Sequence, residues 1–120
     1  ITMTDYRIQL IKTVEDAVPE LRDKIQAGAV DAGTPAPFAT FSTPEEKPIR
    51  TKNGIVGYDI IFEVAVYDKR VSGAEQLRHK VLAALEGLQI ENKRCWYKSY
   101  TTDYYPEYDL HSAVLTFRII

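Results

Sequence analysis

The fold is decided by Tyr58-Asp59-Ile60-Ile61-Phe62-Glu63-Val64-Ala65-Val66-Tyr67, a stretch in which every second side chain is strongly apolar. Successive side chains of a strand point to opposite faces, so this alternation predicts a strand with one apolar face. That face holds Tyr58, Ile60, Phe62, Val64 and Val66. An apolar face of this size has to be covered, and the chain is therefore expected to build a sheet with helices packed on it.

A helix is predicted directly after this strand, beginning near Ser72. Ser72 and Glu75 have the spacing of a capping box, in which each side chain accepts a hydrogen bond from a backbone N–H that the helix leaves unpaired. The apolar residues that follow are three or four positions apart and form one stripe, made of Ala74, Leu77, Val81, Ala84, Leu85 and Leu88. We expect this stripe to face the sheet.

The N-terminal segment is predicted to form another amphipathic helix. Its apolar stripe consists of Ile11, Val14, Val18, Leu21 and Ile25. Pro19 lies inside this run, where it removes one backbone donor and clashes with the preceding turn. The helix is therefore expected to kink or break near Ala17.

Three further segments have the apolar and β-branched composition of strands, namely residues 38–42, 94–100 and 110–120. The elements then follow the order α-β-β-α-β-β. The predicted fold is α+β, with two helices packed on one face of a mainly antiparallel four-stranded sheet. Between the first two strands, the polar segment from Pro44 to Gly57 is either a long hairpin arm or a mobile loop.

The composition is that of one globular domain without a strong charge field. The chain has 120 residues, of which 45% are hydrophobic and 27% are charged, and its formal net charge is -2. Residues 3–120 are expected to fold as a single domain. A reader of nucleic acid would carry a basic face, which this charge disfavours. No run of about 20 apolar residues and no leader segment occurs, so no contact with a membrane is predicted.

No set of side chains predicts a cofactor or a metal site. Cys95 is the lone cysteine and is expected to be a small buried hydrophobe, while His79 and His111 lack partners at ligand spacing. Asp103 and Glu107, taken with His111, match an acid–base site poorly. There is also no Gly-rich phosphate loop and no nucleophile elbow, so the chain is not expected to be an enzyme.

Two segments are candidate surfaces for contacts with other proteins. The first is an aromatic cluster of Trp96, Tyr97, Tyr100, Tyr104, Tyr105 and Tyr108. Tyr and Trp are enriched at interface centres, although strands also favour aromatic residues that pack in a core. The second is a candidate assembly arm with the charged residues Glu45, Glu46, Lys47, Arg50 and Lys52. This arm is either a solvated hairpin tip or a segment that becomes ordered against a neighbour.

Several features in series carry a resemblance to a known family. They are Pro37-Phe38-Ala39-Thr40-Phe41 after a first helix, the strand from Tyr58 to Tyr67, a helix with Leu77, Val81, Leu82 and Leu85, and a closing strand Leu110-His111-Ser112-Ala113-Val114-Leu115-Thr116-Phe117. Together they resemble the tail-completion or tail-terminator proteins of long-tailed bacteriophages, which are small α+β proteins. The resemblance covers almost the whole chain.

The resemblance implies a structural protein that forms a ring, commonly a hexamer, at the head-proximal end of the tail tube. Such a ring stops polymerisation of the tube and joins the tail to the head connector. The implied partners are other copies of the chain, the tail-tube protein and the head–tail connector protein, with no cofactor and no catalysed reaction. The implied location is the host bacterial cytoplasm during assembly and then the head–tail junction of the virion.

Two other functions fit the same residues. One is a different head–tail joining or minor tail component of a phage or prophage. The other is a non-phage α+β module that binds a small ligand or a peptide between the helices and Trp96, Tyr97 and Tyr100, which would require a discrete apolar pocket.

Overall fold

The computed structural model describes residues 3–27 and 34–120. The helices are α1 (Met3–Ala17) and α2 (Val71–Leu85), and a short 3-10 helix, η1 (Pro19–Leu21), follows α1. The strands are β1 (Ile25–Ala27), β2 (Phe38–Thr51), β3 (Gly54–Asp68), β4 (Gln89–Ile90), β5 (Lys93–Tyr105) and β6 (Leu110–Ile119).

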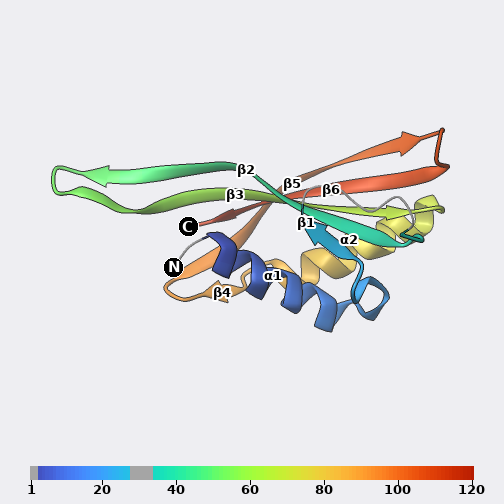
Figure 1. Cartoon of the computed structure of the whole chain (residues 1–120), viewed down its shortest axis with the longest axis horizontal. Coiled ribbons are helices and arrows are strands. Elements are labelled where there is room, and N and C mark those ends of the chain that lie inside the picture. Colours follow the sequence, from blue (N-terminus) through green and yellow to red (C-terminus); the bar gives the residue numbers. More distant parts are fainter. Residues whose placement is uncertain (1–2, 28–33) are drawn as a thin grey trace.

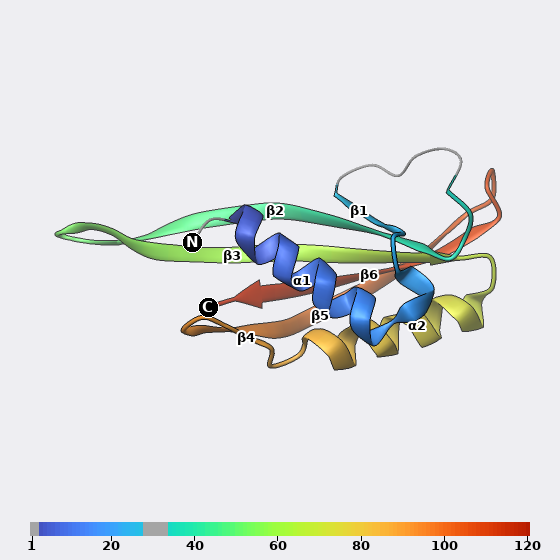
Figure 2. The ribbon, with the colours of Figure 1, turned by 60° about the horizontal axis from the view of Figure 1, so that its bottom comes forward.

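The six strands form one sheet in the order β1-β2-β3-β6-β5-β4. The β1–β2 pair is parallel and the other neighbouring strands are antiparallel, so the sheet is mixed. Figures 1 and 2 show α1 and α2 side by side on the same face of this sheet. The β2–β3 and β5–β6 hairpins extend toward opposite ends of the molecule, whose longest dimension is 51 Å (Figure 1).

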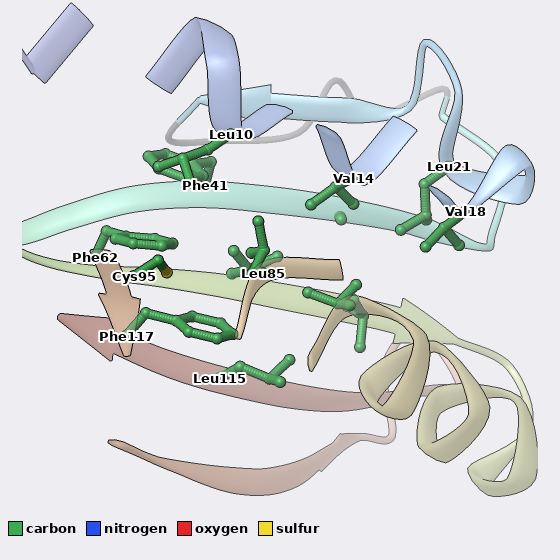
Figure 3. Packing of buried hydrophobic residues seen from close by; sticks show 14 of the residues in the cluster. Leu10, Val14, Val18, Leu21, Phe41, Phe62, Leu85, Cys95, Leu115 and Phe117 are labelled. Carbon is green, nitrogen blue, oxygen red and sulfur yellow. The ribbon is translucent and has the colours of Figure 1, made fainter. Parts of the chain in front are cut away.

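A row of stacked aromatic rings forms the centre of the core. Phe62 of β3 lies between Phe41 and Phe117, with ring centroids 5.2 Å from each. Figure 3 shows this row across β2, β3 and β6, with Leu10 and Leu85 of the two helices packed over it. The predicted apolar face of β3 is confirmed from Ile60 to Val66, because its alternate side chains are buried in this core.

The prediction of a four-stranded sheet in the order α-β-β-α-β-β is wrong, because two short strands extend the sheet. β1 adds a parallel strand beside β2, and β4 adds an antiparallel strand beside β5. These strands contain 3 and 2 residues, which is too few to show an alternating pattern in the sequence. Ile25, predicted to lie in the first helix, belongs to β1.

The predicted break of the first helix is confirmed. α1 ends at Ala17, and η1 begins at Pro19. The chain continues to bury apolar side chains after the break, since Val18 and Leu21 are both fully buried. Proline therefore changes the direction of the chain without interrupting the core.

The predicted capping box of α2 is wrong. The helix begins at Val71, and the N-cap residue is Arg70, which makes no side-chain cap hydrogen bond. The carboxylate of Asp68 occupies the space at this helix start, where it accepts a hydrogen bond of 3.4 Å from the Arg70 N–H. A Cβ atom at Gly73 would collide with that carboxylate, so glycine leaves room for it.

Cys95 lies in the core, as predicted for a buried hydrophobe. Burial, followed by the charge of Glu86, raises the pKa of the Cys95 thiol to about 12. Within residues 3–27 and 34–120, no helix is long and apolar enough to cross a membrane.

Replacement of Phe62 by alanine is expected to lower the free energy of unfolding by about 3–5 kcal/mol, because it leaves a cavity in the centre of the aromatic row. Urea unfolding followed by circular dichroism measures the change. Val71→Ala is the matched control, since Val71 is 59% exposed, and it should have little effect. Equal losses in the two variants would contradict the central position of Phe62 in the core.

Candidate assembly surfaces

The β5–β6 hairpin forms one end of the molecule and carries most of the predicted aromatic cluster. We call the segment from Tyr100 to His111 the tyrosine hairpin. Its turn is closed by a hydrogen bond of 3.1 Å from the Tyr108 N–H to the Tyr105 carbonyl. Tyr108 is 70% exposed at the tip, and Tyr104 is 44% exposed.

A local contact holds Tyr104 in place. Its hydroxyl donates a hydrogen bond of 3.0 Å to Oδ1 of Asp109, and its ring lies 4.6 Å from that of His111. The bond to Asp109 also raises the pKa of the Tyr104 hydroxyl. The exposed ring is therefore presented in a fixed position, which lowers the entropy lost when a partner covers it.

The other aromatic residues of the cluster lie on different faces. Tyr100 lies on the helix-covered face, where the Arg78 guanidinium stacks over its ring at 4.0 Å. Tyr105 lies on the opposite face, with its ring 6.3 Å from that of Tyr67. The structure thus places aromatic side chains on both sides of one narrow hairpin.

Trp96 and Tyr97 precede the tyrosine hairpin on β5, where they pair with Arg118 and Phe117 of β6. The Tyr97 ring packs edge-on against Phe117 at 5.8 Å and so belongs to the margin of the core. Trp96 is 44% exposed and lies beside Arg118 on the face away from the helices. The structure therefore separates these two residues from the tip, although all six are close in sequence.

The segment from Pro44 to Gly57 is an ordered hairpin arm at the opposite end of the molecule (Figure 1). We call it the arm. At its turn, the Asn53 N–H donates to the Thr51 hydroxyl at 3.2 Å, and Gly54 has a φ of +110°, which favours glycine. Of the two alternatives left open by the sequence, the structure shows the hairpin.

The charged residues of the arm have different surroundings. Lys47 forms an ion pair of 2.7 Å with Glu45, which raises the pKa of the lysine. Arg50 and Lys52 lie nearer the tip, are exposed, and form no ion pair within the described residues. Glu46 lies on the wall of the groove at the base of the arm.

Two contacts attach the base of the arm to the rest of the sheet. Arg118 donates two hydrogen bonds, of 2.8 and 2.7 Å, to the carboxylate of Asp59. The Lys93 ammonium donates a hydrogen bond of 2.7 Å to the carbonyl of Tyr58. An open groove of about 480 Å³ lies beside this base, between the arm, Tyr6 of α1 and the turn from β4 to β5.

The sequence interpretation rests on the charged residues of the arm and misses its exposed apolar side chains. We call these side chains, Ile49, Ile55, Val56 and the adjoining Tyr58, the apolar strip. Ile55 and Val56 are 48% and 63% exposed, and Ile49 and Tyr58 are also exposed. The signal was present in the sequence, since an Ile-Val pair between Gly54 and Gly57 adjoins a charged turn. Because successive side chains of a strand point to opposite faces, the arm exposes apolar groups on both faces, and such groups are typical of contact surfaces.

The outer edge of the arm is poorly suited to pair with another strand. β2 pairs with β1 only from Ala39 to Phe41, and further along it pairs with β3 alone in the part of the chain that the structure describes. Pro44 and Pro48 lie in this outer part, and each lacks the N–H that a strand ladder requires.

Chemical sites are not evident in the described residues. No group of three or more His, Cys, Asp or Glu side chains there could hold a metal ion. Asp103, Glu107 and His111 all lie in or near the hairpin turn, and Asp103 accepts a hydrogen bond of 2.8 Å from the neighbouring Tyr104 N–H. The exposed aromatic, apolar and charged side chains described above lie mainly on the arm and the tyrosine hairpin, at the two ends of the molecule.

Comparisons with known proteins give a family match and a similar fold. Residues 11–120 match the family described as tail completion protein gp17. Among solved structures, a chain from the virion of a native gene transfer agent particle has a similar fold, with a TM-score of 0.57 and 22% sequence identity. That match covers 92% of this chain and 81% of the other. No curated protein sequence matches this chain.

Replacement of Asp59 by asparagine tests the attachment of the arm. The hydrogen bonds from Arg118 lower the pKa of Asp59 in the folded protein. The ion pair therefore stabilises the fold above the unfolded pKa of about 4, and this contribution is lost as the pH falls through the lower folded pKa.

Urea midpoints measured across the acidic range should show Asp59→Asn less stable than the wild type at neutral pH. The two proteins should converge at the acid end of the range. A difference that stays constant with pH would mean that the charge of Asp59 does not contribute.

Proposed function

We propose, because this chain belongs to the tail completion protein gp17 family, that it forms a ring on the head-proximal end of a phage tail tube. The ring stops polymerisation of the tube and joins the tail to the head connector. The family match over residues 11–120 carries this proposal, and it gives the chain a structural role in a phage tail.

The shape of the subunit supports a ring. A ring is built from head-to-tail contacts, in which two different surfaces of each copy meet. In this proposal the arm and the tyrosine hairpin are these two surfaces. They lie at opposite ends of the molecule (Figures 1 and 2), and they expose different side chains. A subunit with one self-complementary patch would instead favour a twofold dimer.

The proposed partners follow from this position. Other copies of the chain contact it within a ring of about six, the tail-tube protein contacts one side of the ring, and the head–tail connector protein contacts the other. Assembly takes place in the host bacterial cytoplasm, and the protein then stays at the head–tail junction of the virion. No catalysed reaction is part of this function.

The solution mass tests the ring. Light scattering over a wide concentration range, with negative-stain imaging of the largest species, is expected to show closed particles of about six copies. Most soluble oligomers are dimers or dihedral tetramers, so a particle of this size would be informative. Monomers at every concentration, together with no binding to tail-tube protein, would contradict the proposal.

Replacement of Tyr108 by alanine should weaken the assembly without unfolding the subunit. Its side chain is 70% exposed, so its loss costs the isolated subunit little, whereas removal of an interface tyrosine commonly costs more than about 1 kcal/mol of binding free energy. Sedimentation measures assembly, and the urea midpoint measures folding.

Ile8→Ala is the matched control for Tyr108→Ala. Ile8 is also exposed, at 63%, but it lies on α1. Normal assembly of the Tyr108→Ala variant would exclude this tyrosine from the interface.

A further inference from the structure

The outer part of the arm carries only positive charge. From residue 47 to residue 58 the sequence contains Lys47, Arg50 and Lys52, and no Asp or Glu. Lys47 is paired with Glu45, which lies nearer the base. Arg50 and Lys52, on either side of Thr51, are exposed and form no ion pair within the described residues. They lie next to the apolar strip.

The tyrosine hairpin carries the opposite charge. From residue 99 to residue 117 the sequence contains Asp103, Glu107 and Asp109, and no Lys or Arg. All three carboxylates are exposed and form no ion pair within the described chain. The Arg78 guanidinium approaches this hairpin, but it lies over the ring of Tyr100.

We propose that the tip of the arm of one copy docks on the tyrosine hairpin of the next copy, with Arg50 and Lys52 facing Asp103 and Glu107. This inference rests on the proposed ring and specifies which surfaces meet and by what chemistry. The two tips lie at opposite ends of a molecule 51 Å long, so a copy cannot satisfy its own charges in this way. A second copy supplies the complementary end.

Side chains, rather than a shared strand ladder, make this contact. Pro44 and Pro48 remove backbone donors from the outer edge of the arm, which disfavours strand addition there. Exposed apolar and aromatic side chains on both tips supply buried area, with Val56 on the arm and Tyr108 on the hairpin. Opposite charges on the two tips then orient the copies head to tail and disfavour contacts between like ends.

Charge reversal tests the contact. One variant combines Arg50→Glu with Lys52→Glu, and the other combines Asp103→Lys with Glu107→Lys. Asp109 is kept because it holds the Tyr104 hydroxyl. Each variant alone is expected to raise the concentration needed for ring formation by at least about tenfold, because like charges then meet at the interface.

An equimolar mixture of the two variants provides the decisive measurement. The acidic arm of the first variant matches the basic hairpin of the second, and the basic arm of the second matches the acidic hairpin of the first. Mixed rings in which the two variants alternate are therefore expected at concentrations where neither variant assembles alone. Native mass spectrometry of differently tagged variants measures the ratio, which should be one to one.

The matched control combines Lys12→Glu with Arg22→Glu, which gives the same change of charge at exposed positions outside both tips. Circular dichroism and urea midpoints check that all variants fold. If either reversed variant forms rings at the same concentration as the wild type, or if the mixture fails to assemble, the proposed contact is wrong, although the ring itself can still form. Absence of any wild-type ring, with or without tail-tube protein, would overturn both proposals.

Discussion

Helices and strands with the same number of residues differ greatly in length, and this difference shapes the molecule. α1, α2 and β3 each contain 15 residues. A helix of that size spans about 22 Å and a strand about 50 Å. The two helices therefore cover only part of the sheet, and the β2–β3 hairpin projects beyond them (Figures 1 and 2). Beyond the apolar core, the Asp59–Arg118 ion pair attaches the base of the arm to β6. Such a contact matters because an isolated hairpin is only marginally stable.

The long elements of the fold were predictable because each repeats its pattern over many residues. The buried face of β6 and the stripe of α2 through Leu77 and Val81 follow directly from spacing. β1 and β4 were not predictable, because they are too short to show a sequence pattern and are strands only by their hydrogen bonds to β2 and β5. The start of α2 was predicted wrongly for a different reason. The helix begins at Val71, one residue before the Ser72 that the capping pattern assigned as N-cap, and the Asp68 side chain lies against Gly73. The resemblance to phage tail completion proteins is confirmed by the family match.

The candidate surfaces were predictable in sequence but not in space. Tyr104 and Tyr108 lie at an exposed tip, whereas Tyr97 contacts the core, and only the register of β5 against β6 distinguishes them. A register shift between Tyr97 and Ser99 changes which residues share a face, and no residue type signals it. The exposure of Ile55 and Val56 was not predicted, because apolar residues in a strand are commonly buried.

The two prolines of the arm also bear on how far the protein can polymerise. A sheet that grows without limit, as in an amyloid fibre, needs two receptive edges on every copy, one to join the growing end and one to receive the next copy. Pro44 and Pro48 make one of these edges unreceptive along the outer half of β2. Strand addition along this part of β2 is therefore disfavoured. An edge of this kind protects a subunit rich in long exposed strands from open-ended growth through a backbone ladder.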